Sequence, residues 1–204
     1  MVIPYGDHTV SMGAPIPQQA ARAKLGLSNE DKLCLVFGTV SPYKGIDELL
    51  EFWVAKAPPA RLLVVGPILN SQFAEGLRSM AGSSPSVDLR IGEQWLDDEA
   101  LRLWLSAADC ALFNYREIFT SGAASLARSY GVPVVIPSRL EAADLHEPHP
   151  LVFRFDSPST DLMDVLDAAL SAGCSYDMAA QWRHDTRWEQ VAQATVAAYR
   201  AHLE

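Results

Sequence analysis

Six short apolar runs, separated by segments with helical periodicity, constrain the fold of this chain more than any other feature. The runs are predominantly apolar and do not alternate between apolar and polar residues, which is typical of strands buried on both faces of a sheet. The runs span residues 33–38, 61–66, 87–91, 111–115, 132–136 and 151–155. Such strands, when helices separate them, form parallel sheets that are covered on both faces. The sequence therefore predicts an α/β fold, doubly wound and Rossmann-like, with a parallel sheet of about six strands and helices on both faces.

The segments between the runs carry helix signals. Within residues 43–56, apolar side chains recur at helical spacing, and the prolines at 58 and 59 then stop the helix. Further helices are expected at 18–25, 71–80, 97–107, 160–170, between Gly122 and Gly131 and, as one long terminal helix, at 180–203. The length of 204 residues allows one large domain or two small ones. We expect a single domain over residues 1–204.

Composition and charge narrow the classes of function. Hydrophobic residues make up 49% and charged residues 20%, as in ordinary globular proteins. The net charge of −9 disfavours non-specific binding to nucleic acid or anionic membranes, although it allows a local basic pocket. No apolar run approaches the roughly 20 residues of a membrane span, and the N-terminus lacks a secretory signal pattern. We expect a cytoplasmic protein with small-molecule ligands, no nucleic-acid partner and no direct membrane span.

Metal and disulfide chemistry find no support in the sequence. The chain has 3 cysteines and 5 histidines, and these residues show neither CxxC nor HExxH spacing. Surface histidines and free thiols are the favoured interpretation. We therefore expect no metal and no cofactor apart from the substrate itself.

The turn Gly38–Gly45 (GTVSPYKG), directly after the first apolar run, is one candidate for ligand binding. Lys44 can reach toward phosphates at the edge of the sheet, and Gly45 lets the backbone approach a ligand closely. The spacing is neither that of a Walker loop nor that of a GxGxxG dinucleotide fingerprint. The alternative is that Pro42 and Gly45 are turn residues and that Lys44 is a solvated lysine at a helix start.

The second candidate is the turn after the fourth apolar run, within FNYREIFTSG. Thr120, Ser121 and Gly122 can expose backbone N–H groups at a helix start, which favours binding of a diphosphate. Glu117 can accept hydrogen bonds from sugar hydroxyls. Taken by itself, this turn favours a simpler alternative, which is a salt bridge between Arg116 and Glu117 followed by a helix cap.

Together, the two turns resemble the carboxyl-terminal, nucleotide-sugar-binding domain of GT-B glycosyltransferases of the group-1 superfamily. The pattern G-R-x-x-P-x-K-G of that family corresponds to Gly38–Gly45, and its G-x-P-V-V pattern corresponds to Gly131–Val135. The segment VIPYGD resembles the interdomain hinge, which assigns residues 1–16 to a hinge or linker. Trp188 resembles the tryptophan that opens the last helix. The resemblance covers nearly the whole chain and implies a further, amino-terminal acceptor domain that these residues do not contain.

The resemblance also implies roles for individual residues. Lys44 would contact the donor diphosphate, Glu117 would bind the donor sugar, and both are expected to be catalytic residues. The base would stack near the end of the third strand. The complete expected donor site comprises Gly38, Thr39, Lys44, Gly92, Gln94, Trp95, Glu117, Thr120, Ser121, Gly122 and Ser125. These residues would bind a nucleotide-diphospho-sugar, without metal, for transfer of the sugar to an acceptor that the sequence does not identify.

The chain departs from the family pattern at two positions. Thr39 replaces the usual arginine, and Ser125 replaces the second glutamate of the paired-glutamate motif. A hydroxyl at Ser125 can still meet a ribose, which favours a working donor site. The rival hypothesis is a non-catalytic nucleotide-sugar-binding or scaffolding domain, in which both substitutions reflect lost activity.

Overall fold

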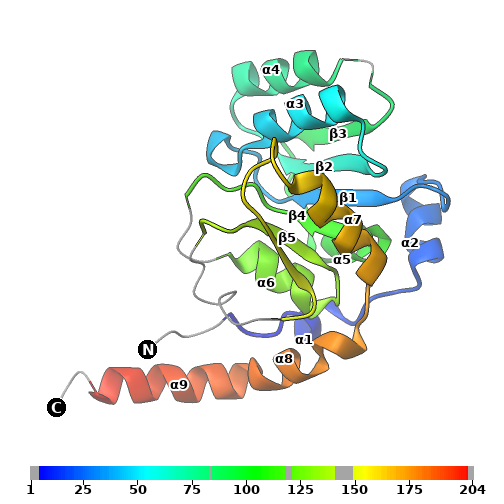
Figure 1. Cartoon of the computed structure of the whole chain (residues 1–204). Helices are drawn as coiled ribbons and strands as arrows, with labels where there is room; N and C mark the ends of the chain where they lie inside the picture. Colours follow the sequence, from blue (N-terminus) through cyan, green and yellow to red (C-terminus); the bar gives the residue numbers. More distant parts are fainter. Residues whose placement is uncertain (1–4, 83, 118–120, 141–148, 202–204) are drawn as a thin grey trace.

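The computed structural model describes residues 5–82, 84–117, 121–140 and 149–201, and a six-stranded sheet forms its centre (Figure 1). The strands pair in parallel in the order β3-β2-β1-β4-β5-β6. Their bounds are β1 Leu33–Phe37, β2 Arg61–Pro67, β3 Val87–Gly92, β4 Cys110–Leu112, β5 Val134–Pro137 and β6 Val152–Phe155. Each apolar run of the sequence contributes a strand, so the predicted doubly wound α/β fold is confirmed.

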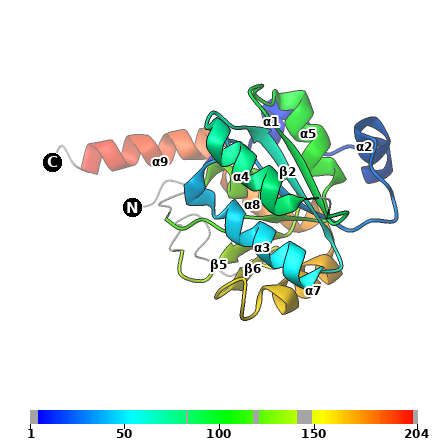
Figure 2. The same ribbon diagram turned by 90° about the horizontal axis from the view of Figure 1, so that it is seen from above.

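Helices cover both faces of this sheet (Figure 2). Along β1, Leu33, Leu35 and Phe37 pack in one core cluster with α2, α5 and α6, whereas Cys34 and Val36 pack in the other with α3, α4 and α7. The α-helices are α1 Thr9–Met12, α2 Gln18–Leu25, α3 Ile46–Lys56, α4 Ser71–Ala81, α5 Asp98–Ala107, α6 Gly122–Ser129, α7 Leu162–Ala172, α8 Ala180–Asp185 and α9 Trp188–Ala201. This two-sided burial explains why a central strand such as β1 is apolar along its whole length.

The strand order makes the carboxyl ends of β1 and β4 the place where a ligand-binding crevice is expected. From β1 the chain continues to β2 on one side of the sheet, and from β4 it continues to β5 on the other. When the connections after two adjacent strands run in opposite directions, a crevice forms at the carboxyl ends of these two strands. β4 is shorter than the expected strand 111–115, because it ends at Leu112 and residues 113–115 belong to the turn. The predicted site therefore begins closer to the sheet than expected.

The expectation of one helix over residues 180–203 is wrong, because α8 and α9 are separate. Thr186 ends α8: its N–H and its hydroxyl both donate to the carbonyl of Trp182, at 3.0 and 2.8 Å, which completes the last turn. The carbonyl of Thr186 accepts from the N–H of Asp7 at 2.8 Å and so takes no part in the next helix. Residues 202–203 lie outside the described residues.

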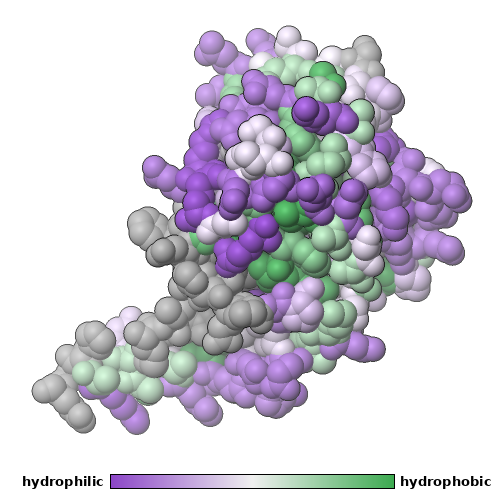
Figure 3. Space-filling model, in the orientation of Figure 1, coloured by the Kyte–Doolittle hydropathy of each residue, from purple (hydrophilic) through white to green (hydrophobic). Residues whose placement is uncertain are grey.

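The last helix, α9, extends away from the domain (Figure 2), and none of its described side chains is buried. Val196 is 50% exposed and Tyr199 is 71% exposed, so α9 shows hydrophobic as well as hydrophilic surface (Figure 3). Trp188 anchors its start by donating from Nε1 to the carbonyl of Asp7 at 3.0 Å. Among the described helices, none is long and apolar enough to cross a bilayer.

Candidate functional site

The turns after β1, β2 and β3 meet at the carboxyl end of the sheet. The N–H of Gly38 donates to the carbonyl of Val65 at 3.1 Å, and the N–H of Ile68 donates to that of Gly92 at 2.7 Å. Gly66 permits this close approach, since its φ is +143° and a Cβ there would clash with the carbonyl of Gly38. Ligands of doubly wound folds bind at this edge, so these turns line one side of the candidate crevice.

Lys44 points into the protein at this edge. It ends the short 3-10 helix η1 (Pro42–Lys44), is only 6% exposed, and donates from Nζ to the carbonyl of Phe37 at 3.0 Å. Its Nζ lies 5.8 Å from the centre of the Tyr115 ring. Burial lowers the pKa of Lys44 to about 8, because the charged form loses hydration. The alternative of a solvated lysine is therefore wrong.

The turn that carries Lys44 is fastened to the end of β4. The side-chain amide of Asn114 donates to the carbonyl of Gly45 at 3.0 Å, and the N–H of Arg116 donates to the carbonyl of Tyr43 at 2.8 Å. Gly45 has a φ of +60°, and a Cβ at this position would overlap Asn114. The two predicted turns, far apart in the sequence, thus form one continuous site.

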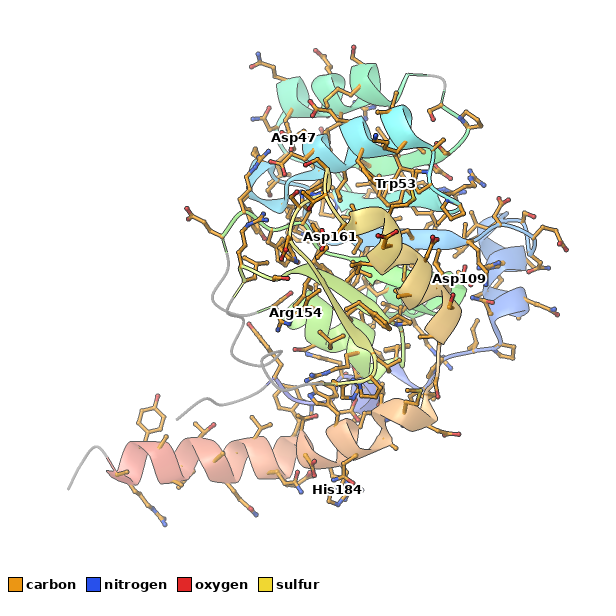
Figure 4. The ribbon with its side chains drawn as sticks, viewed as in Figure 1. Asp47, Trp53, Asp109, Arg154, Asp161 and His184 are labelled. Atoms are coloured by element: carbon orange, nitrogen blue, oxygen red, sulfur yellow. The ribbon has the colours of Figure 1, made fainter. Side chains whose placement is uncertain are left out.

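Arg116 pairs across this junction with carboxylates of α3. Its Nη2 lies 2.8 Å from Asp47 and 2.8 Å from Glu48. These hydrogen bonds raise the pKa of Arg116, with Asp47 the larger cause. Asp47 is labelled at the start of α3 in Figure 4. The alternative of an Arg116–Glu117 salt bridge is therefore wrong, because the guanidinium reaches the first turn of α3 instead.

The start of α6 forms the other side of the crevice. Ser121 caps this helix, because its hydroxyl accepts from the N–H of Ala124 at 3.1 Å. Gly122 opens the helix, and a Cβ there would meet the ring of Tyr5 at 3.5 Å. Ser121 also lies near Tyr115, whose pKa is raised by burial. Tyr115 is therefore close both to Lys44 and to the helix start that is predicted to bind phosphate.

Four further residues of the predicted donor site differ in how exposed they are and in whether the structure describes them. Glu117 is exposed just beyond Arg116, and Thr39 is partly exposed in the turn after β1. Ser125 lies within α6 with no exposed surface, so its hydroxyl does not open into the crevice. Thr120 lies outside the described residues.

A cavity of about 690 Å³ lies at the carboxyl ends of β2 and β3, beside the start of α5. Its lining includes Gly92, Gln94 and Trp95, the three residues expected near the base. Trp95 is 70% exposed, which leaves its ring available for stacking. Gly66 also lines this cavity, so the cavity adjoins the turns that surround Lys44.

Three further hollows among the described residues contain none of the predicted site residues. One, of about 420 Å³, lies between α3 and the segment after β6 and is lined by Phe52 and Pro158, among others. Across the described parts of the chain, no group of three or more histidine, cysteine or carboxylate side chains is placed to hold a metal ion. The expectation of metal-free chemistry stays a prediction.

Sequence reasoning did not identify three residues that the structure brings to the crevice, which are Asn114, Tyr115 and Arg139. Asn114 and Tyr115 were assigned to a strand, where their side chains had no expected role. Arg139 follows β5 and donates from Nη2 to the carbonyl of Tyr115 at 3.2 Å. The polar Asn114 at the end of an apolar run was the signal that could have revealed the first of them.

Comparison with known proteins gives structural matches only. No protein-family model matches the chain, and no curated protein is similar in sequence. Sucrose-phosphate synthase from Thermosynechococcus elongatus matches 100% of this chain and 52% of its own length, with a TM-score of 0.76 and 21% identity. HepE from Anabaena, solved in complex with UDP and glucose, matches 97% of this chain and 55% of its own, with a TM-score of 0.71 and 17% identity.

A third match is a single domain. The C-terminal domain of a group-1 family glycosyl transferase, LpcC from Francisella tularensis, matches over 81% of this chain and 92% of its own, with a TM-score of 0.61 and 17% identity. The chain thus spans about half the length of the first two proteins and nearly all of an isolated C-terminal domain. Its fold is that of the C-terminal domain of group-1 GT-B glycosyltransferases, and the predicted resemblance is confirmed at the level of the fold.

Proposed function

We propose that this chain is the donor-binding domain of a glycosyltransferase and that it binds a nucleotide-diphospho-sugar in the crevice between β1 and β4. The observation that carries the proposal is the buried ammonium of Lys44. Within the described residues it has a carbonyl and an aromatic ring as neighbours but no carboxylate. A buried cation without a counter-charge is costly, and an anionic ligand beside it would remove that cost.

The neighbouring groups suit the parts of such a donor. The start of α6, at Ser121 and Gly122, would bind the diphosphate through backbone N–H groups and a favourable helix dipole. The cavity beside Trp95 has room for the base. Glu117, on the exposed side of the same turn, would accept hydrogen bonds from the sugar. HepE was solved with UDP and glucose, which supports the same ligand class for this fold.

In glycosyl transfer, the leaving diphosphate gains negative charge as the bond to the sugar breaks. Lys44 and the α6 N-terminus would stabilise that charge in place of a metal ion. Glu117 would hold the sugar in position for attack by the acceptor. The acceptor and the second wall of the crevice would come from an amino-terminal domain, as the sequence resemblance implies.

The second candidate is a domain that binds nucleotide sugars without transferring them. The burial of Ser125 favours it, because a hydroxyl inside α6 cannot replace a ribose-binding carboxylate. Both candidates predict donor binding, and they differ in whether the full-length protein transfers sugar. An acceptor-side catalytic base in the full-length gene product would favour the enzyme.

A thermal-shift screen tests the shared part of the proposal. We expect UDP, ADP or GDP, or the corresponding nucleotide sugar, to raise the melting temperature, because a ligand at 100 times its Kd adds about 2.7 kcal/mol of stability. No shift with any of these compounds would contradict donor binding. We also expect this chain alone to bind donor without transferring sugar. Transfer to an added acceptor, above the level of donor hydrolysis, would place an acceptor site within these residues.

A further inference from the structure

Two arginine side chains reach the carboxyl end of β4, and their electrostatic surroundings differ. Arg116 lies between Asp47 and Glu48 at 2.8 Å from each, so α3 neutralises its charge. Arg139, in the segment after β5, is exposed and donates to a backbone carbonyl. Within the described residues, no carboxylate lies at ion-pair distance from Arg139. Among the described residues, no ion pair therefore offsets the positive charge that Arg139 brings to the carboxyl end of β4.

Arg139 is hydrogen-bonded to Tyr115, a residue that also lies beside Lys44 in the proposed phosphate site. Its Nη2 lies 3.2 Å from the carbonyl of Tyr115. The Nζ of Lys44 lies 5.8 Å from the centre of the Tyr115 ring, and Ser121 also lies near this tyrosine. The two cations and the start of α6 are thus all neighbours of Tyr115.

A diphosphate needs more positive charge than Lys44 supplies. Its two phosphate groups carry more than one negative charge near neutral pH, and a helix N-terminus contributes only about half an elementary charge. Arg116 cannot contribute, because Asp47 and Glu48 already neutralise it. Arg139 remains, and a guanidinium has five N–H donors, in a planar arrangement that suits phosphate oxygens. The single carbonyl bond to Tyr115 leaves other donors available for a ligand.

We propose that Arg139 is the second cation of the site and binds the diphosphate of the donor opposite Lys44. This inference rests on the proposed function, because it assigns a residue to the ligand proposed there. In the ligand-free protein, the bond to the Tyr115 carbonyl holds the guanidinium beside the crevice. On binding, the diphosphate would bridge Lys44 and Arg139 above the start of α6.

Calorimetric titration with UDP and with inorganic pyrophosphate tests the proposal in the wild type, Arg139→Gln, Arg139→Lys and Arg61→Gln. Arg61 is the matched control, because its ion pair with Asp31 lies at the amino end of β2. We expect Arg139→Gln to weaken binding of both probes about tenfold, since hydrogen bonds between charged groups are the strong ones. Arg139→Lys should recover part of the loss, and Arg61→Gln should bind as the wild type does. The difference should shrink at high salt, because Arg139 is exposed.

The outcomes separate this inference from the proposed function. If Arg139→Gln binds both probes as the wild type does while Lys44→Met does not, the role of Arg139 is wrong and the donor site stands. If Arg139→Gln and Arg139→Lys lose affinity equally and both melt earlier, Arg139 only supports the Tyr115 carbonyl, and the proposal is overturned. If the wild type binds neither UDP, ADP, GDP nor pyrophosphate, the proposed function fails and the role of Arg139 with it.

Discussion

Two buried cations, Arg22 at the amino end of the central strands and Lys44 at their carboxyl end, have different hydrogen-bond and ion-pair partners. Arg22 in α2 is 2% exposed and lies 2.6 Å from the carboxylate of Asp109, with further bonds to backbone carbonyls. Lys44 is 6% exposed and has the carbonyl of Phe37 as its hydrogen-bond partner. Figure 4 shows Asp109 at the amino edge of the sheet and Asp47, near the Lys44 turn, at the other.

The difference distinguishes a structural cation, Arg22, from Lys44, the cation that we propose binds a ligand. At the amino edge, Asp109 also accepts from the N–H of Leu33 and from Lys32, so its charge and hydrogen-bonding capacity are met within the protein. At the carboxyl edge the protein holds Lys44 in a dry environment that lowers its pKa to about 8. Such unmatched groups cluster at functional sites, because the ligand completes what the fold leaves open.

Asp109→Asn should give the largest effect, because it leaves the Arg22 charge buried without its partner. We expect a loss of about 3–5 kcal/mol of unfolding free energy, measured in urea. The matched control is Asp31→Asn in the partly exposed pair with Arg61, for which about 0–1 kcal/mol is expected. Equal effects of the two variants would show that the amino edge is not held by this buried pair.

The pH dependence of stability should reveal the cost of burying Lys44. Its pKa is about 8 in the folded protein and 10.5 as the ordinary value, so the unfolded state binds more protons between these values. Stability should therefore rise with pH across this window, relative to Lys44→Met, by on the order of 3 kcal/mol. Urea unfolding of both proteins from pH 7 to 10.5 measures it.

Binding should respond to pH in the opposite direction. A diphosphate prefers the charged ammonium, so the affinity for UDP should be highest near neutral pH, where the terminal phosphate is ionised, and should fall above a pH of about 8. If affinity stays constant through this range in the wild type, Lys44 does not contact the bound diphosphate.

Glu117→Gln should give a smaller and more selective effect. The substitution keeps size and hydrogen-bonding capacity but removes the charge, so affinity for a nucleotide sugar should fall about threefold to tenfold. Affinity for the nucleoside diphosphate should stay the same or rise slightly. Titrations with UDP-glucose and UDP compare the two. A parallel loss of both affinities would mean that Glu117 organises the turn, and since Arg116 pairs with α3, it would do so without that arginine.

The sheet and its connections could be predicted from sequence, because the central strands are buried on both faces and every residue of β1, β4 and β5 is buried. The break before α9 could not, because it depends on a hydrogen bond between Thr186 and Asp7, which are far apart in the chain. Apolar periodicity reports burial, whereas a long-range polar contact leaves no local pattern.

In the candidate site, too, local sequence patterns predicted some features, whereas those that depend on long-range contacts could not be predicted. The pattern around Gly38–Gly45 predicted a lysine near a crevice, but it could not distinguish a solvated Lys44 from a buried one. That distinction depends on Asn114 and Tyr115, which β4 brings alongside the turn. Arg139 was not predicted for the same reason, since its link to Tyr115 arises only when β5 lies beside β4.

The central claim is that the unmatched charge of Lys44 serves an anionic ligand, and one comparison tests it most directly. The nucleoside diphosphate that stabilises the wild type most is titrated calorimetrically into the wild type, Lys44→Met and the exposed-lysine control Lys24→Met. We expect Lys44→Met to lose at least about tenfold in affinity, or roughly 1.5–3 kcal/mol, with an unchanged or raised melting temperature. Lys24→Met should match the wild type. Equal affinity in all three proteins would contradict the account.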